Sequence, residues 1–500
     1  MKKLRLPILV FILFSAVSVT AVASIPEDAP VYSSAVKPVF SAGTSATLLT
    51  QAIHPNALYT EEERTWEVAV QGQEQGRLAM TTAVLPSGTL YYFLRYEPKG
   101  WSPEPIVLIV PIELQEDFTY RTITYPDGFD FVKSVWSEAM QGEAGTALPK
   151  ETAFIEESNR SMLIGYIDVY EKQESEVRKE RYELGKAVLP TREGLVITLP
   201  QVSNSIVETW GFVGAKPLFD WESSTAVDLR MGDFNRVRKW TREGMLVATP
   251  STYSPTSPRS FWLNPTNAVG EKFLRTQGSQ IFEDFALVSL YASLRWQNDK
   301  GYWYTSPTSL WLNGDYGIGR YFYDTRFNTD QALFLLKGYN RYQDPRLLAS
   351  SEEYARYLLD HIEARHFLMD NGGYLVSDYA FDAKPDIKTH ASLNHQLAEM
   401  NYLLELYKTT SNEEYLIAAE KLRDGVIATA PHWENEAGDL HYAYLPDGTY
   451  GMKDYPLLTL KDLRYSQALF EQVYGERHPV FDTLIQIKEA YLREQGLPLY

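Results

Sequence analysis

Two loops in the second half of this chain carry tyrosines close to lysines. Tyr379 lies in a loop that also contains Lys384 and Lys388, and Tyr455 follows Lys453 in a second loop. A phenol has a reference pKa of about 10, so it is a poor base until nearby positive charge stabilises the phenolate. Tyrosines placed beside lysines on loops are therefore candidates for acid–base catalysis by proton transfer.

Carboxylates and histidines in the same part of the chain leave other chemistries open. An acid and a base drawn from five acidic residues would suffice for glycoside hydrolysis, although no pair stands at a distinguishing spacing. His361 and His366 are five residues apart, which does not place two ligands on one helix face, so no zinc site is predicted. His395 is interpreted as a capping or core hydrogen-bond partner. The acidic residues are Asp378, Asp382, Asp386, Asp454 and Glu399.

A unit of roughly 70 residues repeats through this half of the chain and would position the loops. Each unit has two segments with apolar residues at helical spacing, followed by a turn with glycine and aromatic residues. A helix pair cannot bury its apolar stripe alone, so the pairs are expected to stack into an incomplete α/α toroid of about four hairpins. The turns are residues 298–303, 370–374 and 436–442; the predicted helices are residues 281–296, 329–342, 345–366, 392–408, 413–430, 457–474 and 479–494, with a partner near Glu271.

Several helix ends and one glycine-rich segment can be assigned from local composition. Asp344, Asn412 and His478 precede helical patterns and are predicted N-caps, as is Ser392. Residues 313–320 contain three glycines but follow no strand of a βαβ unit. We interpret them as a flexible cleft loop, not a nucleotide site.

The first half of the chain has a different pattern. Short β-type runs between residues 61 and 245 alternate with turn residues, which predicts an antiparallel β-sandwich. Residues 24–60 show little periodicity and are expected to be irregular, and the proline- and serine-rich residues 246–270 are predicted to be a linker. The predicted fold is therefore α+β and multidomain, with the β-sandwich followed by the toroid in residues 271–500.

The N-terminus has the features of a secretory signal. A charged start, an apolar run and Ala21-Val22-Ala23 predict a signal peptide in residues 1–23, cleaved after Ala23. The mature protein is then expected to be secreted or periplasmic, with an uncleaved N-terminal anchor as the alternative. The 500 residues include no cysteine, which excludes disulfides and thiol catalysis.

Charge and aromatic content narrow the class of ligand. The 47 basic and 65 acidic residues give a net charge of −18, which argues against a nucleic-acid partner. The 34 Tyr, 22 Phe and 11 Trp suit a glycan ligand, because sugar rings stack on aromatic faces. An aromatic protein core is the alternative explanation for the same composition.

The loop motifs resemble those of a known family. Asp378-Tyr379 followed by Ser392-Leu393-Asn394, and later Asp454-Tyr455 before the final helices, resemble the C-terminal catalytic domain of the D-glucuronyl carbon-5 epimerases that act on heparosan-type chains. Between them, residues 438–442 are similar to that family's Gly-Thr-Ile-Tyr hairpin. The resemblance covers the chain from about Asp324 onward.

This resemblance implies a role for each matching residue. Three tyrosines would transfer protons on the two faces of a sugar ring, and six polar residues would bind the substrate. The tyrosines are Tyr379, Tyr442 and Tyr455. The polar residues are Arg320, Arg326, Lys384, Lys453, Asn394 and Asp378.

The expected function is epimerisation of uronate residues in a polysaccharide, of the glucuronate-to-iduronate type, at carbon 5. Direct deprotonation needs no organic cofactor, and no metal is implied. A polysaccharide lyase or a glycoside hydrolase on the same toroid is an alternative. Met452-Lys453 and Pro456 depart from the family's pattern, which also keeps open a non-catalytic glycan-binding envelope protein. A homodimer is kept as one possible assembly.

Overall fold

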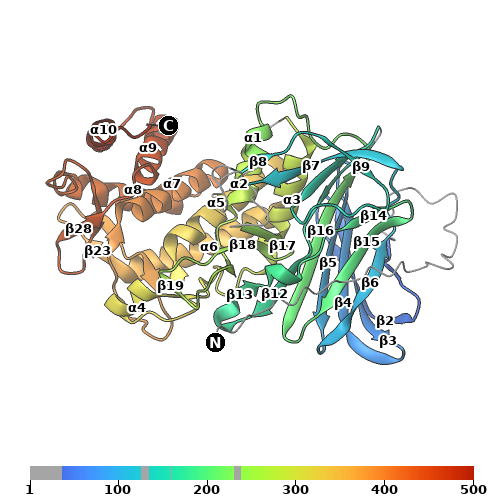
Figure 1. Ribbon diagram of the computed structural model, residues 1–500. Coiled ribbons are helices and arrows are strands. Elements are labelled where there is room, and N and C mark those ends of the chain that lie inside the picture. The colour runs from blue at the N-terminus through green and yellow to red at the C-terminus, as the bar shows by residue number, and fades with distance from the viewer. Residues whose placement is uncertain (1–35, 126–133, 159, 230–237, 277, 500) are drawn as a thin grey trace, which may run out of the picture.

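The computed structural model describes residues 36–125, 134–158, 160–229, 238–276 and 278–499. The predicted signal peptide, residues 1–23, lies outside the described residues. Strands occupy the first part of the described chain and helices the second, at opposite sides of the molecule (Figure 1). The order is therefore that of an α+β protein with its β-rich part first.

A large antiparallel sheet forms the centre of the β-rich part. Its longest strands pair in the order β2, β3, β4, β5 and β16, and shorter strands continue from β16 in two directions. Its members are β2 Thr44–Pro55, β3 Thr60–Val70, β4 Gln73–Val84, β5 Leu90–Pro98, β7 Asp117–Thr124, β8 Val135–Trp136, β9 Met140–Glu143, β10 Ala153–Glu156, β11 Ser161–Ile164, β12 Asp168–Lys172, β13 Arg178–Glu180, β16 Ser205–Gly214, β17 Arg238–Thr241, β18 Gly244–Ala248 and β20 Ser260–Leu263.

A second sheet covers one face of the large sheet. It contains β1 Val39–Phe40, β6 Ser102–Val110, β15 Gly194–Gln201 and β14 Leu189–Thr191, in the order β1, β6, β15, β14. Leu108 of β6 and Ile197 of β15 pack in one buried cluster with Tyr92 of β5. Two antiparallel sheets packed face to face make a β-sandwich.

The other face of the large sheet packs on a helix. Tyr91 and Phe93 of β5 belong to the same buried cluster as Phe285 of α3 Gln280–Arg295. Successive side chains of a strand point to opposite faces, so β5 contributes to two cores at once. This explains why the run Leu90–Leu94 is apolar without alternation, as expected of a strand that is buried on both sides.

Two sequence-based predictions in the β-rich part are wrong. Residues 24–60, predicted to be irregular, contain β2, whose side chains are mostly exposed and so lack the alternation that marks a half-buried strand. This segment is a strand because it pairs with β3. Residues 246–270, predicted to be a linker, contain most of β18 and all of β20, which pair with each other in the large sheet. The prolines of this segment lie outside both strands.

The helical part is a row of hairpins in two layers. The helices α3, α5, α7 and α9 pack on one another in sequence, and α6, α8 and α10 pack on α5, α7 and α9 respectively. Their bounds agree with the predicted helices to within a few residues. The helices are α2 Ala268–Arg275, α3 Gln280–Arg295, α5 Thr325–Tyr342, α6 Pro345–Arg365, α7 Leu393–Thr410, α8 Glu413–Thr429, α9 Leu458–Tyr474 and α10 Pro479–Glu494.

Local capping explains where several of these helices begin. The side chains of Asp344, Asn412 and His478 accept hydrogen bonds from backbone N–H groups at the starts of α6, α8 and α10, as predicted. Ser392 stands at the N-cap position of α7 but makes no side-chain cap. Its hydroxyl has another partner, described below.

The predicted cleft loop, residues 313–320, is partly helical instead. Helix α4 Leu310–Tyr316 begins at Ser309, whose side chain accepts from the N–H of Leu312. It ends at Gly317, which has a φ of 67°. Glycine adopts this left-handed conformation without a steric penalty, so it terminates the helix.

Short strands between the long helices hold the loops together. β22 Tyr323–Asp324 pairs with β25 Tyr379–Ala380, and β26 Ala391–Ser392 pairs with β27 His441–Tyr444. Segments that are far apart in the sequence therefore meet at the start of α5 and α7. The remaining short strands are β19 Tyr253–Ser254, β21 Thr308–Ser309, β23 His366–Leu368, β24 Tyr374–Val376 and β28 Tyr450–Lys453, and a helix α1 spans Ala226–Leu229.

The contact between α8 and the turn at Gly373 leads to a stability prediction. A Cβ on Gly425 of α8 would collide with the backbone carbonyl of Tyr374, whereas a Cβ on Gly314 of α4 meets no atom within 4 Å. We expect Gly425→Ala to destabilise the fold by about 1–3 kcal/mol through overpacking. Gly314→Ala, the matched control, should stabilise it by up to about 1 kcal/mol through helix propensity. Midpoints of thermal unfolding test both; equal midpoints would contradict the close packing.

Candidate functional site

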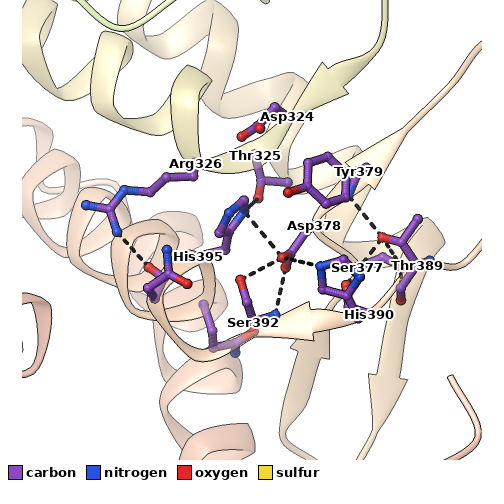
Figure 2. Close-up of polar contacts among 12 residues, drawn as sticks. Asp324, Thr325, Arg326, Ser377, Asp378, Tyr379, Thr389, His390, Ser392 and His395 are labelled. Carbon is purple, nitrogen blue, oxygen red and sulfur yellow. Dashed lines mark hydrogen bonds and ion pairs between the residues drawn. The ribbon is translucent and has the colours of Figure 1, made fainter. Parts of the chain in front are cut away.

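A buried carboxylate lies where the loops before α5 and α7 meet. Asp378 is fully buried, and its Oδ1 accepts from the N–H of Ser392 at 2.8 Å. Its Oδ2 accepts from the Ser392 hydroxyl at 2.6 Å, which is the partner that replaces the expected helix cap. Figure 2 shows Asp378 between the rings of two histidines, His390 and His395. One carboxylate thus joins the start of α7 to the loop before β25.

The two histidines contact the same carboxylate oxygen. The Nε2 of His390 lies 3.3 Å from Oδ2 of Asp378, and the Nδ1 of His395 lies 3.7 Å from it. Burial opposes ionisation, but His395, His390 and Ser392 hold the pKa of Asp378 below its ordinary value. Asp378 is therefore charged at pH 7 and can orient both rings.

His395 is a neutral, hydrogen-bonded ring, in agreement with its interpretation as a core hydrogen-bond partner. Its Nδ1 lies 2.8 Å from the Thr325 hydroxyl at the start of α5. Burial lowers the pKa of His395 to about 4, and Asp378 only partly opposes this. The ring is uncharged at pH 7.

His390 connects the buried carboxylate to a tyrosine nearer the surface. Its Nδ1 lies 3.0 Å from the hydroxyl of Tyr316 in α4, and its backbone N–H donates to the same oxygen at 3.3 Å. Nε2 makes no hydrogen bond to Asp378 at this distance, and a proton on Nε2 would leave Nδ1 to accept from the Tyr316 hydroxyl. The order Tyr316, His390, Asp378 matches a reactive hydroxyl, a base and an acidic residue that orients the base.

Aromatic rings extend from His390 on two sides. Trp311 of α4, which is 37% exposed, lies 4.9 Å from the His390 ring. Tyr442 lies 5.9 Å from His390, and Tyr455 lies 5.7 Å from Tyr442. Tyr455 is half exposed. A continuous line of rings therefore runs from Tyr316 through His390 and Tyr442 to the surface at Tyr455.

The three predicted tyrosines differ in exposure. Tyr379 and Tyr442 are almost buried, at 6% and 7% exposed, whereas Tyr455 is 53% exposed. The Tyr379 ring packs against His390, His395 and Phe322. Burial raises the pKa of Tyr379 and Tyr442 well above the ordinary value, and partial burial raises that of Tyr455. The structure brings all three to one site as neutral phenols.

Arg326, predicted to bind a substrate carboxylate, is already paired. It donates to Asp330 one turn later on α5 and to Asp462 of α9 at 2.6 Å. It also donates to the backbone oxygen of Asn394 at 3.0 Å. The internal carboxylates neutralise its charge. Its hydrogen bonds connect α5 to α7 and α9. Asn394 is buried at the start of α7, and its side-chain oxygen has no partner among the described residues.

The other predicted basic residues lie at the rim or away from it. Arg320 is 55% exposed and lies 3.8 Å from Glu174, which belongs to the β-rich part. Lys384 is exposed and donates to the backbone oxygen of Tyr316 at 2.9 Å, so it fastens the end of α4. Lys453 is exposed at the end of β28, two residues before Tyr455.

Asp454, named among the candidate carboxylates, has a structural environment. It accepts from Lys488 of α10 and from the Thr459 hydroxyl, each at 2.7 Å. Lys488 is fully buried and also donates to Asp439 at 2.7 Å. These ion pairs anchor the loop that carries Tyr455 to the last helix.

Two further acidic residues lie beside the site. Asp324 caps α5 by accepting from the N–H of Phe327, and burial raises the pKa of Asp324 to about 7. Glu399, one turn after His395 on α7, is fully buried, and neither of its carboxyl oxygens has a hydrogen-bond partner among the described residues. Burial raises the pKa of Glu399 well above its ordinary value, which favours its protonated form.

The sequence analysis missed four of the residues gathered here. Trp311 and Tyr316 lie on the helix that was predicted as a loop, and Asp324 and Thr325 were outside the motifs. Tyr316 and His390 are 74 residues apart, so no local spacing indicated their contact. The polar residues around Asp324 at the start of a helical pattern were the available signal.

Within the described ranges, no group of three or more His, Asp or Glu side chains is arranged to hold a metal ion. In those ranges, none of the helices combines the length and apolar character needed to span a bilayer. The site is thus built from acid, imidazole and phenol groups.

Comparison with known proteins gives remote structural likenesses. No family model and no curated protein matches the chain. A D-mannose isomerase structure is 17% identical over 45% of this chain and 58% of that chain, with a TM-score of 0.34. A family 76 glycoside hydrolase from a bovine Bacteroides thetaiotaomicron strain is 12% identical over 81% and 75%, with a TM-score of 0.37. The cellobiose 2-epimerase from Spirochaeta thermophila is 14% identical over 46% and 59%, with a TM-score of 0.34.

These likenesses are too weak to assign an activity. Each TM-score is below 0.5, and each identity is below 25%. The chain also spans less than two thirds of the isomerase and the cellobiose epimerase that it matches. The function must therefore be argued from the site itself.

Glu399 gives the site a testable pH dependence. Above the unfolded-state pKa of about 4.3, the unfolded chain releases the Glu399 proton and the folded protein keeps it. Stability should therefore fall as pH rises, by up to about 1.4 kcal/mol per pH unit for this one proton. Glu399→Gln removes this loss, so the variant should gain stability relative to the original protein between pH 4.5 and pH 7.

Unfolding free energies measured by denaturant titration across that pH range test this prediction. Glu413→Gln, at an exposed position at the start of α8, is the matched control for loss of a glutamate. A constant difference between Glu399→Gln and the original protein would show that Glu399 carries its charge in the fold.

Proposed function

We propose that this chain binds a carbohydrate at the line of rings and transfers a proton at a sugar carbon, as an epimerase does. The observation that carries this proposal is the series of contacts from Tyr316 to His390 and from His390 to Asp378. Aromatic side chains lie beside His390, and one of them, Tyr442, contacts the half-exposed Tyr455. Trp311 and Tyr455 offer exposed ring faces on which a sugar can stack. We also infer that the row of hairpins is an incomplete α/α toroid with this site at its open end.

Tyr316 is our candidate for the base. As its oxygen takes a proton from the sugar, its own proton can pass to Nδ1 of His390, and Asp378 stabilises the resulting imidazolium. The N–H of His390 donates to the same oxygen and stabilises negative charge there. This arrangement removes the need for a free phenolate, which the raised pKa of Tyr316 would disfavour.

Tyr455, with Tyr442 beside it, is our candidate for the acid. A phenol with a raised pKa is protonated at pH 7 and can donate a proton to the opposite face of the ring. Tyr316 contacts His390 and Tyr455 contacts Tyr442, so both phenols border the same line of rings. Tyr379, between the two histidines, is assigned a positioning role.

A uronate is our preferred substrate within this class. The carboxylate of a uronate acidifies the proton at carbon 5 once a cation or hydrogen bonds neutralise it. Arg326 is committed to Asp330 and Asp462, so Lys453 at the rim is the candidate partner. A polysaccharide lyase would form the same deprotonated intermediate. That intermediate would then expel the oxygen at carbon 4 instead of taking up a proton at carbon 5.

Binding without chemistry is the second candidate function. The burial of Asp378 and His390 favours it, because both groups lie behind the rings of the site. The exposed aromatic residues would then serve recognition only.

Deuterium incorporation separates these functions. In heavy water with heparosan or alginate, we expect deuterium at carbon 5 without chain cleavage. Tyr316→Phe should reduce incorporation by about 100-fold or more, because it removes an acid–base group. Tyr321→Phe, a nearby tyrosine outside the site, is the matched control.

The remaining outcomes are equally informative. Incorporation accompanied by unsaturated products would identify a lyase. Oligosaccharide binding without incorporation would support the recognition function. Incorporation that Tyr316→Phe leaves unchanged would exclude the proposed base.

A further inference from the structure

A cavity lies beside strand β27, which carries Tyr442 of the line of rings. It has a volume of about 340 Å³ and is lined by Glu363, His366, Phe367, Leu368, Lys388 and Tyr444. We call it the Lys388 cavity. It lies between the end of α6, the hairpin of β23 and β24, and β27.

Two segments connect this cavity to the candidate site. Tyr444 follows Tyr442 by two residues on β27, and Lys388 precedes His390 by two residues. Residues two apart on a strand point to the same face and lie about 7 Å apart. Ala391, next to His390, pairs with Tyr444, so the two segments are neighbours. The cavity therefore lies beside the segments that carry Tyr442 and His390.

The walls of the cavity are aromatic and apolar. The rings of Phe367 and Tyr444 meet at 5.2 Å in an edge-to-face arrangement, and both are half-buried. Leu368 is 66% exposed beside them. Rings and an exposed apolar side chain in one small cavity suit the C–H face of a sugar.

The cavity contains one lysine, Lys388. Lys388 donates to the backbone oxygen of His366 at 2.9 Å, and its Nζ lies 5.5 Å from the centre of the Phe367 ring. Within the described ranges, no carboxylate forms an ion pair with it. The carboxylate that lines the cavity, Glu363, lies 3.1 Å from Lys421 of α8 and is neutralised there. Lys388 thus has unused donors beside an aromatic wall.

We propose that the Lys388 cavity binds an acidic sugar residue of an oligosaccharide that also reaches the line of rings. Phe367 and Tyr444 contact the sugar ring, and Lys388 binds its carboxylate or sulfate group. This inference rests on the proposed function for the register of the oligosaccharide, but not for the anion preference of the cavity.

Binding measurements with matched ligands test the proposal. The ligands are a heparosan tetrasaccharide, its carboxyl-reduced form and a sulfated neutral tetrasaccharide, titrated by calorimetry. The original protein should bind each anionic ligand about three- to fivefold more tightly than the reduced form, as expected for a solvent-exposed ion pair. Added salt should shrink this preference.

Variants at the cavity make the prediction specific. Lys388→Gln should reduce the preference for the anionic ligands, and Lys388→Arg should keep it. Lys461→Gln, which removes an exposed lysine of α9, is the control and should also keep it. Phe367→Leu should weaken the binding of all three ligands. A preference that Lys388→Gln leaves unchanged, or no binding of any ligand, would overturn the proposal.

The test also separates this inference from the proposed chemistry. Tyr316→Phe should lose deuterium incorporation but keep the Lys388-dependent preference. A protein that shows this preference but never incorporates deuterium would refute the epimerase proposal and leave the acidic subsite in place.

Discussion

The candidate site depends on a single buried charge, the carboxylate of Asp378. A buried carboxylate is costly unless hydrogen bonds and nearby positive partial charge compensate it. Here Ser392 supplies two donors, and His390 and His395 lie on the same oxygen. Because these partners come from the start of α7 and the segment before it, satisfying the charge fixes the positions of both rings. The aromatic residues Tyr316, Trp311 and Tyr442 pack against the ring of His390, so its position determines theirs.

Acidic groups dominate the interior around this charge, which determines what the site can do. Burial raises the pKa of Asp324 and of Glu399, and repulsion from Asp378 adds to both rises. Arg326 and Lys488 use their charges on internal partners. Proton transfer through a hydrogen-bonded relay is compatible with such surroundings, whereas a free phenolate is not.

Much of the fold follows from local pattern, and much of the site does not. Helical spacing and caps such as Asp344 and Asn412 act within a few residues, so the helices were predictable. β2 and β20 exist through pairing with distant strands, which no local periodicity records. Tyr442 and Tyr455 were found through short motifs, but Tyr316 meets His390 only through tertiary packing. Arg326 and Asp330 are four residues apart on α5, so their pairing was readable from the sequence and was overlooked.

The large sheet is shared between two cores, and this limits how the protein can be divided. Tyr91 and Phe93 of β5 pack with Phe285 of α3, while Tyr92 faces the second sheet. Severing the chain near residue 264 would expose aromatic surface on both fragments. Neither half would then be a self-sufficient folding unit. If evolution joined the helical part to another domain, that domain would have to present α3 with an aromatic surface equivalent to that of β5.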